Sequence, residues 1–158
     1  MDQATWVYQM QHFSTWFRCI AIDTVGYGRS PSTDDGVTWS RPVDITATFE
    51  PFRSKYDWKV IATGPGHGIQ LTLGRLVVPV WLSSASAGAH RPSAVATIYS
   101  DDAGRSWKRG DLVAAPPALA NPSESSVVEL DAGGVMINMR HEGEQMMRAV
   151  STSKDGAK

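Results

Sequence analysis

The apolar residues of this 158-residue chain fall in short runs rather than in long stripes. Nowhere do they recur at i, i+3, i+4 and i+7 over several turns, which is the pattern of an amphipathic helix. The runs are rich in Val, Ile, Leu and Thr and are bounded by Gly, Pro, Asp and Ser, as is typical of strands joined by turns. The pattern therefore predicts an all-β protein in which helix is a minor component.

The chain contains seven clear candidates for strands, and turn residues separate most of them. The glycine-rich segment 64–68 (G-P-G-H-G) precedes no helix, so we interpret it as a turn that lets two backbones approach closely rather than as a phosphate cradle. Asp131–Gly134 predicts a hairpin. Residues 1–28 show no consistent period, and we treat them as a segment apart from the folded region 29–158. The candidate strands are 58–63, 69–73, 76–82, 94–99, 127–130, 135–140 and 146–151.

An eight-residue pattern, S-x-D-x-G-x-[T/S]-W, occurs twice. Residues 32–39 read S-T-D-D-G-V-T-W and residues 100–107 read S-D-D-A-G-R-S-W, and a damaged third copy begins within S-T-S-K-D-G-A-K at 151–158. About four strands separate one octamer from the next, which is the number in one blade of a β-propeller. The positions that match are Ser32, Asp34, Gly36, Thr38 and Trp39 in the first octamer and Ser100, Asp102, Gly104, Ser106 and Trp107 in the second.

The octamer has a structural explanation of its own. The short aspartate side chain can accept hydrogen bonds from backbone N–H groups of a turn, and the glycine allows the positive φ that such a turn needs. The tryptophan can then cover the turn and anchor it to a sheet. We therefore interpret Asp34 and Asp102 as turn-forming residues and not as catalytic ones.

Charge and composition exclude several classes of protein. Lys and Arg number 15 against 16 Asp and Glu, so the net charge of −1 gives no field that would attract nucleic acid or an acidic membrane. The longest apolar run, 76–82, is interrupted by Pro79 and is too short to span a membrane. Asp2 stands where a signal peptide carries Lys or Arg, so no export signal is visible and the location in the cell stays unknown.

Cysteine and histidine offer no metal or redox site. Cys19 is the only cysteine, which excludes an internal disulfide and a cysteine-based zinc site. The four histidines are scattered, and no two have the spacing of metal ligands. We expect no metal and no cofactor. The histidines are His12, His67, His90 and His141.

The octamers resemble the Asp boxes (BNR repeats) of the sialidase, or neuraminidase, superfamily. Further segments are similar to the central part of bacterial-type exo-α-sialidases: T-G-P-G-H-G-I-Q-L at 63–71, G-R-L-V-V-P-V at 74–80, N-P-S-E-S-S-V-V-E-L at 121–130 and M-I-N-M-R at 136–140. The resemblance covers roughly 30–158. It implies a six-bladed β-propeller, of which this chain supplies about two to three blades, and a glycosidase that removes terminal sialic acid from glycoconjugates without a cofactor.

The resemblance assigns two site residues. Glu124 matches the glutamate that activates a tyrosine nucleophile, and Arg140 matches the second of three arginines that hold the sialic acid carboxylate. The tyrosine, the catalytic aspartic acid and the other two arginines match no position here. We therefore expect the chain alone to be inactive, and its open sheet edges to favour association. Two alternatives stay open: a non-catalytic Asp-box propeller that binds glycans or proteins, and a hydrolase that acts on another acidic sugar.

The spacing of these two residues also carries an argument. They are sixteen residues apart on either side of a turn at 132–133, so partner numbers in the hairpin sum to about 265. This register places Glu124 opposite His141 and diagonal to Arg140, within reach of long side chains. Arginine suits a planar carboxylate because its fork donates two parallel hydrogen bonds. Without the resemblance, the pair would be interpreted as a surface ion pair.

Three other charged residues near the hairpin are interpreted as structural. Glu129 lies five positions after Glu124, and an odd separation along a strand puts it on the opposite face of the sheet. Glu142 and Arg148 could reach the region of Arg140, but a solvated face accounts for them.

Overall fold

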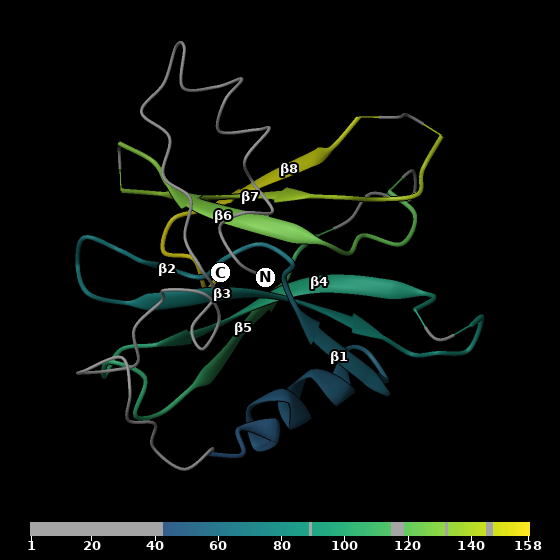
Figure 1. The fold of residues 1–158 in the computed structure, drawn as a ribbon, viewed down its shortest axis with the longest axis horizontal. Helices are drawn as coiled ribbons and strands as arrows, with labels where there is room; N and C mark the ends of the chain where they lie inside the picture. The colour runs from purple at the N-terminus through teal and green to yellow at the C-terminus, as the bar shows by residue number, and fades with distance from the viewer. Residues whose placement is uncertain (1–42, 89, 115–118, 132, 145–146) are drawn as a thin grey trace, which may run out of the picture. The chain divides into compact units, whose positions relative to one another are not determined.

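The structure is a computed structural model, and it describes residues 43–88, 90–114, 119–131, 133–144 and 147–158. The described residues of the compact unit Asp44–Lys158 form two antiparallel sheets and a short 3-10 helix (Figure 1). The prediction of an all-β protein is confirmed. The first octamer, the segment 1–28 and the boundary that follows it lie outside the described residues.

The first sheet has the strand order β1-β3-β4-β5. The short strand β2 pairs with the first two residues of β3, Leu76 and Val77, on the edge where β1 pairs further along. The strands of this sheet are β1 (Val60–Thr63), β2 (Ile69–Gln70), β3 (Leu76–Ser83), β4 (Ser93–Ser100) and β5 (Lys108–Leu112). Of these, β5 was not predicted, because its sequence K-R-G-D-L contains a single apolar residue and shows no alternation.

The second sheet is a three-stranded meander in which β7 lies between β6 and β8. Its strands are β6 (Ser125–Glu129), β7 (Val135–Met139) and β8 (Ala149–Ser153). The hairpin of β6 and β7 was predicted, although β8 begins three residues later than the pattern indicated. Its register differs from the prediction by one: Ser125 pairs with Met139, so partner numbers sum to 264.

The two sheets pack face to face through apolar side chains. Val77 and Val95 of the first sheet contact Val127, Ile137 and Met139 of the second, and all five are nearly fully buried. Neighbouring residues of β3 and β4, such as Val80 and Ile98, point to the other face. Both faces of the first sheet are therefore covered, which explains why β3 is almost continuously apolar and why most residues of β4 are buried.

The 3-10 helix η2 (Thr46–Ser54) covers that other face. Phe49 and Phe52 are buried against β3 and β4, and the ring of Trp58 packs edge-on against Phe49. The Trp58 indole N–H donates to the Phe49 carbonyl at 3.0 Å. These contacts fix the outer face of the first sheet.

The second octamer forms the turn that its sequence predicted. The Asp102 carboxylate accepts hydrogen bonds from the Ser106 amide (2.8 Å) and from the hydroxyls of Ser106 and Ser100. These bonds hold the pKa of Asp102 at about 2. Gly104 has φ +85°, and Trp107 packs beside the aromatic cluster under η2. These three hydrogen bonds of the Asp102 carboxylate thus all serve the turn.

A related turn follows β8, where the third copy was predicted. The Asp155 carboxylate accepts from the amides of Ala157 and Lys158 at 3.0 Å each, and Gly156 has φ +73°. Arg75 joins the two turns, because its guanidinium binds both Asp101 (2.7 Å) and Asp155 (3.1 Å). This contact ties the two sheets together at one end.

Candidate active site

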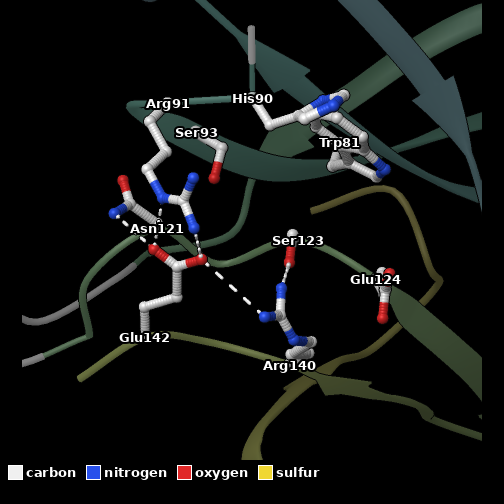
Figure 2. Close-up of a pocket in the computed structure, with 9 residues that line it drawn as sticks. All are labelled: Trp81, His90, Arg91, Ser93, Asn121, Ser123, Glu124, Arg140 and Glu142. Carbon is white, nitrogen blue, oxygen red and sulfur yellow. Dashed lines mark hydrogen bonds and ion pairs between the residues drawn. The ribbon is translucent and has the colours of Figure 1, made fainter. Parts of the chain in front are cut away.

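A cavity of about 190 Å³ lies at the other end of the two sheets. Its lining residues come from β3, the β3–β4 connection and the start of β4 on one side, and from the segments before β6 and after β7 on the other. Figure 2 shows their side chains around the cavity. A hydrogen bond from the Ser93 hydroxyl to the Pro122 carbonyl (2.8 Å) joins the two sheets there. The residues that line the cavity are Trp81, His90, Arg91, Ser93, Asn121, Ser123, Glu124, Arg140 and Glu142.

Glu124 and Arg140 both line this cavity. They lie directly opposite each other, because the Arg140 amide donates to the Glu124 carbonyl at 2.8 Å and the Ser123 amide donates to the Arg140 carbonyl at 2.9 Å. The predicted diagonal arrangement was therefore wrong by one residue, since partner numbers in the hairpin sum to 264 rather than 265. The change brings the two residues closer in register than expected.

The Arg140 side chain reaches into the cavity but is only lightly held. Its Nη1 donates to the Ser123 hydroxyl at 3.4 Å, and its Nη2 lies 3.8 Å from a carboxylate oxygen of Glu142. The side chain is 48% exposed. Most of the guanidinium's hydrogen-bonding capacity is therefore available to a ligand.

Glu124 is exposed and lies on the side of Arg140 away from Glu142 (Figure 2). No ion pair joins it to Arg140 among the described residues. Its backbone carbonyl accepts from Arg148 at 3.2 Å, and Arg148 also binds the side chain of Asn138. An exposed carboxylate beside a cavity can accept a proton from a group that enters the cavity.

Glu142 accepts three side-chain hydrogen bonds, contrary to its interpretation as part of a solvated face. Arg91 binds it with both arms of its fork, at 2.7 and 2.5 Å, and the Asn121 amide donates to it at 3.0 Å. The hydrogen bonds from Arg91 hold the pKa of Glu142 below its ordinary value, and Glu142 in turn raises the pKa of Arg91. The pair is therefore fully charged at neutral pH.

Two aromatic side chains form the opposite wall of the cavity. Trp81 of β3 packs edge-on against His90, with ring centroids 5.4 Å apart. Trp81 also contacts the core between the sheets, so its position is fixed from behind. The cavity thus combines an apolar wall with two guanidinium groups and two carboxylates.

Glu129, five positions after Glu124 on the hairpin, does not line the cavity. Its carboxylate accepts from the amide (2.9 Å) and the hydroxyl (2.9 Å) of Thr72. It therefore fastens the β2–β3 turn to β6, and the structural interpretation of Glu129 agrees with these contacts.

Sequence reasoning did not find Arg91, Asn121 or Ser123 as lining residues. Arg91 and Glu142 are 51 positions apart and lie in segments that adjoin different sheets, so no local pattern connects them. Asn121 and Ser123 stand in the segment N-P-S-E that precedes β6, and the left-handed φ of +48° at Asn121 is a local signal, because asparagine tolerates that conformation better than most residues.

Within the described ranges, no helix is long and apolar enough to cross a membrane. The same residues contain no group of three or more His, Cys, Asp or Glu side chains placed to hold a metal ion.

The chain is similar to known proteins over most of its length. Residues 4–158 match the model of the BNR repeat-like domain. A sialidase of Bacteroides fragilis is 35% identical over 124 residues, which are 78% of this chain and 20% of that protein. A sialidase of Micromonospora viridifaciens is 36% identical over 129 residues, which are 79% of this chain and 18% of that protein.

The fold comparison agrees. The solved structure of a Hadza microbial sialidase superposes with a TM-score of 0.63 at 31% identity, over 80% of this chain and 22% of that one. The chain thus spans about a fifth of the length of each of these three relatives. Its all-β architecture is that of the sialidases, which are β-propellers. The chain belongs to the BNR repeat-like domain family, within the sialidase superfamily.

Proposed function

We propose that this chain forms part of the active site of an exo-α-sialidase, a retaining glycoside hydrolase that releases terminal sialic acid from glycoconjugates. In this proposal Arg140 binds the carboxylate of the sugar, and Glu124 accepts a proton from a tyrosine nucleophile. The tyrosine, the acid catalyst and two further arginines come from segments of the propeller other than this chain. On that basis the 158-residue chain alone does not hydrolyse sialosides.

The observation that carries the proposal is the position of Arg140. Its guanidinium is half exposed and lines the cavity, and within the described part of the chain it makes two long polar contacts, at 3.4 and 3.8 Å. A carboxylate that enters the cavity can accept two parallel charge-assisted hydrogen bonds from such a fork. An acidic sugar is therefore a better fit than a neutral one.

The chemistry of sialic acid explains a role for Glu124. The carboxylate of sialic acid is attached to the anomeric carbon, so it would repel an anionic nucleophile. A tyrosine avoids this repulsion, but its pKa of about 10 requires a neighbouring base. Glu124 is an exposed carboxylate at the cavity, opposite Arg140 in the hairpin, and can serve as that base.

The test uses the complete open reading frame that encodes this chain and a fluorogenic sialoside. Arg140→Ala should raise KM and lower kcat/KM by at least about tenfold, because each hydrogen bond to a charged group contributes about 1.5–3 kcal/mol. Glu124→Ala should lower kcat by about 10²–10⁴, the usual contribution of a general base. Glu144→Ala is the control, since Glu144 is exposed and does not line the cavity.

Two results would contradict the proposal. Full activity of both Glu124→Ala and Arg140→Ala would show that the site lies elsewhere. Binding of sialosides without hydrolysis by the unaltered protein would favour the non-catalytic propeller instead.

A further inference from the structure

The cavity holds a second arginine, Arg91, for which the proposed function has no role. It lies in the connection between β3 and β4, and Glu142 follows β7, so their contact crosses from one sheet to the other. Arg91 uses Nε and Nη2 to bind both oxygens of the Glu142 carboxylate. This is a bidentate pair, the most directional ion pair available to these side chains.

Glu142 makes different contacts with the two arginines of the cavity. Arg91 is within 2.7 Å, whereas the nearest guanidinium nitrogen of Arg140 is 3.8 Å away, which is too far for a hydrogen bond. The Asn121 amide occupies a further position on the same carboxylate at 3.0 Å. Arg140 is thus attracted toward Glu142 but not bound by it.

We propose that Arg91 and Glu142 are a positioning pair for Arg140. Arg91 binds both carboxylate oxygens of Glu142. Glu142 therefore orients the Arg140 guanidinium without forming a close ion pair with it, and Arg140 stays available to the carboxylate of the ligand. This inference rests on the proposed function and adds two residues that control the affinity for the acidic sugar without touching it.

The charges explain why the pair is needed. With Arg91 in place, the two guanidinium groups and the two carboxylates that line the cavity balance, so an anionic ligand at Arg140 meets no net negative charge. Without Arg91, Glu142 has lost its strongest partner and can move the short distance to Arg140, and the two carboxylates of the cavity outnumber its one remaining guanidinium group. The ligand's carboxylate then has to displace an internal carboxylate. Without Glu142, the guanidinium of Arg140 keeps its charge but loses the group that orients it.

The experiment is a double-mutant cycle in the complete open reading frame, assayed with the fluorogenic sialoside. Arg91→Gln should raise KM about tenfold, the effect of one charge-assisted hydrogen bond, and change kcat by less than about twofold. Glu142→Gln should raise KM about threefold to tenfold. Arg91→Gln should then have no further effect in the Glu142→Gln background, because the carboxylate that it releases is absent.

Two further variants sharpen the cycle. Arg91→Lys keeps the charge but loses the fork, so its KM should lie between those of the unaltered protein and Arg91→Gln. Glu144→Gln, an exposed glutamate two positions beyond Glu142, is the control and should leave KM unchanged. The proposal is overturned if Arg91→Gln leaves KM unchanged, or if it raises KM equally in both backgrounds, which would mean that Arg91 contacts the ligand itself.

A separate measurement distinguishes this proposal from the proposed function. In the 158-residue chain, the ¹⁵N heteronuclear NOE of the Arg140 Nε–Hε group reports how well that side chain is ordered, whatever the activity. Glu142→Gln should lower this NOE and Glu144→Gln should not. If the unaltered reading frame hydrolyses no sialoside, the proposed function fails while this NOE still decides the positioning role. An unchanged Arg140 NOE in Glu142→Gln would overturn that role.

Discussion

Substitution of Gly66 by alanine tests how closely the glycine-rich turn 64–68 packs against β6, the strand that directly follows Glu124. A Cβ atom at Gly66 would lie 2.2 Å from the Ser125 carbonyl oxygen and 2.5 Å from the Ser126 hydroxyl oxygen. Both distances are far below van der Waals contact. The prediction that this turn allows a close approach of two backbones is thus confirmed.

The cost of the substitution follows from which of the two segments can move. The backbone of β6 is held by its ladder with β7, in which Ser125 pairs with Met139. The turn must therefore shift by about an ångström, and overpacking of this kind costs about 1–3 kcal/mol. For a chain of this length each kcal/mol lowers Tm by about 2–4 °C, so Gly66→Ala should lower Tm by about 2–12 °C.

The assay is thermal and urea-induced unfolding of the 158-residue chain, followed by circular dichroism. Gly134→Ala is the matched control: this glycine also lacks a positive φ, and the nearest atom to its added Cβ would be the Ser153 carbonyl oxygen at 3.2 Å. That smaller overlap should cost less than about 1 kcal/mol. Equal Tm values for Gly66→Ala and the unaltered chain would refute the close approach and the position of the turn beside β6.

Two further predictions concern stability away from the site. Phe52→Ala should lower the free energy of unfolding by about 3–5 kcal/mol, because Phe52 of η2 is fully buried against the first sheet and its loss leaves a cavity; a urea midpoint equal to that of the unaltered chain would contradict its place in the core. Asp102→Asn should be less stable than the unaltered chain at neutral pH, with a difference that shrinks as the pH falls from 3.8 to about 2. The sign follows because folding lowers the pKa of Asp102, so its carboxylate stabilises the fold fully above its ordinary pKa of 3.8 and loses this effect when it is protonated. Urea midpoints of both proteins between about pH 2 and 7 measure the difference in stability. A difference that does not change with pH would exclude this role of Asp102.

The fold was predictable where the physical cause is local. The second octamer became a turn because Asp102, Ser106 and Gly104 satisfy its backbone within five residues. Strands β3 and β4 were visible because burial of both faces leaves β3 almost wholly apolar and gives β4 a run of small and β-branched residues. Helix η2 was not visible, since T-A-T-F-E-P-F-R-S offers only Phe49 and Phe52 as buried apolar residues and contains Pro51, which disfavours an α-helix.

The candidate site divides in the same way. Glu124 and Arg140 could be placed together because one short hairpin joins them, and the error of one in their register came from the exact centre of its turn. The contact of Arg91 with Glu142 could not be predicted, because it depends on how two sheets pack. The sequence therefore indicated a solvated Glu142, because its partner Arg91 lies in the distant β3–β4 connection.

Arginines join the two sheets at both ends, and the two contacts have different consequences. At the end with the Asp-box turns, Arg75 binds Asp101 and Asp155, far along β3 from the cavity. At the cavity end, Arg91 binds Glu142 beside Arg140. Loss of the first contact loosens the packing of the sheets and should affect stability alone, whereas loss of the second frees a carboxylate next to a ligand-binding guanidinium. The end of the two sheets at which an arginine lies, rather than the strength of its ion pair, thus decides whether its loss alters stability or KM.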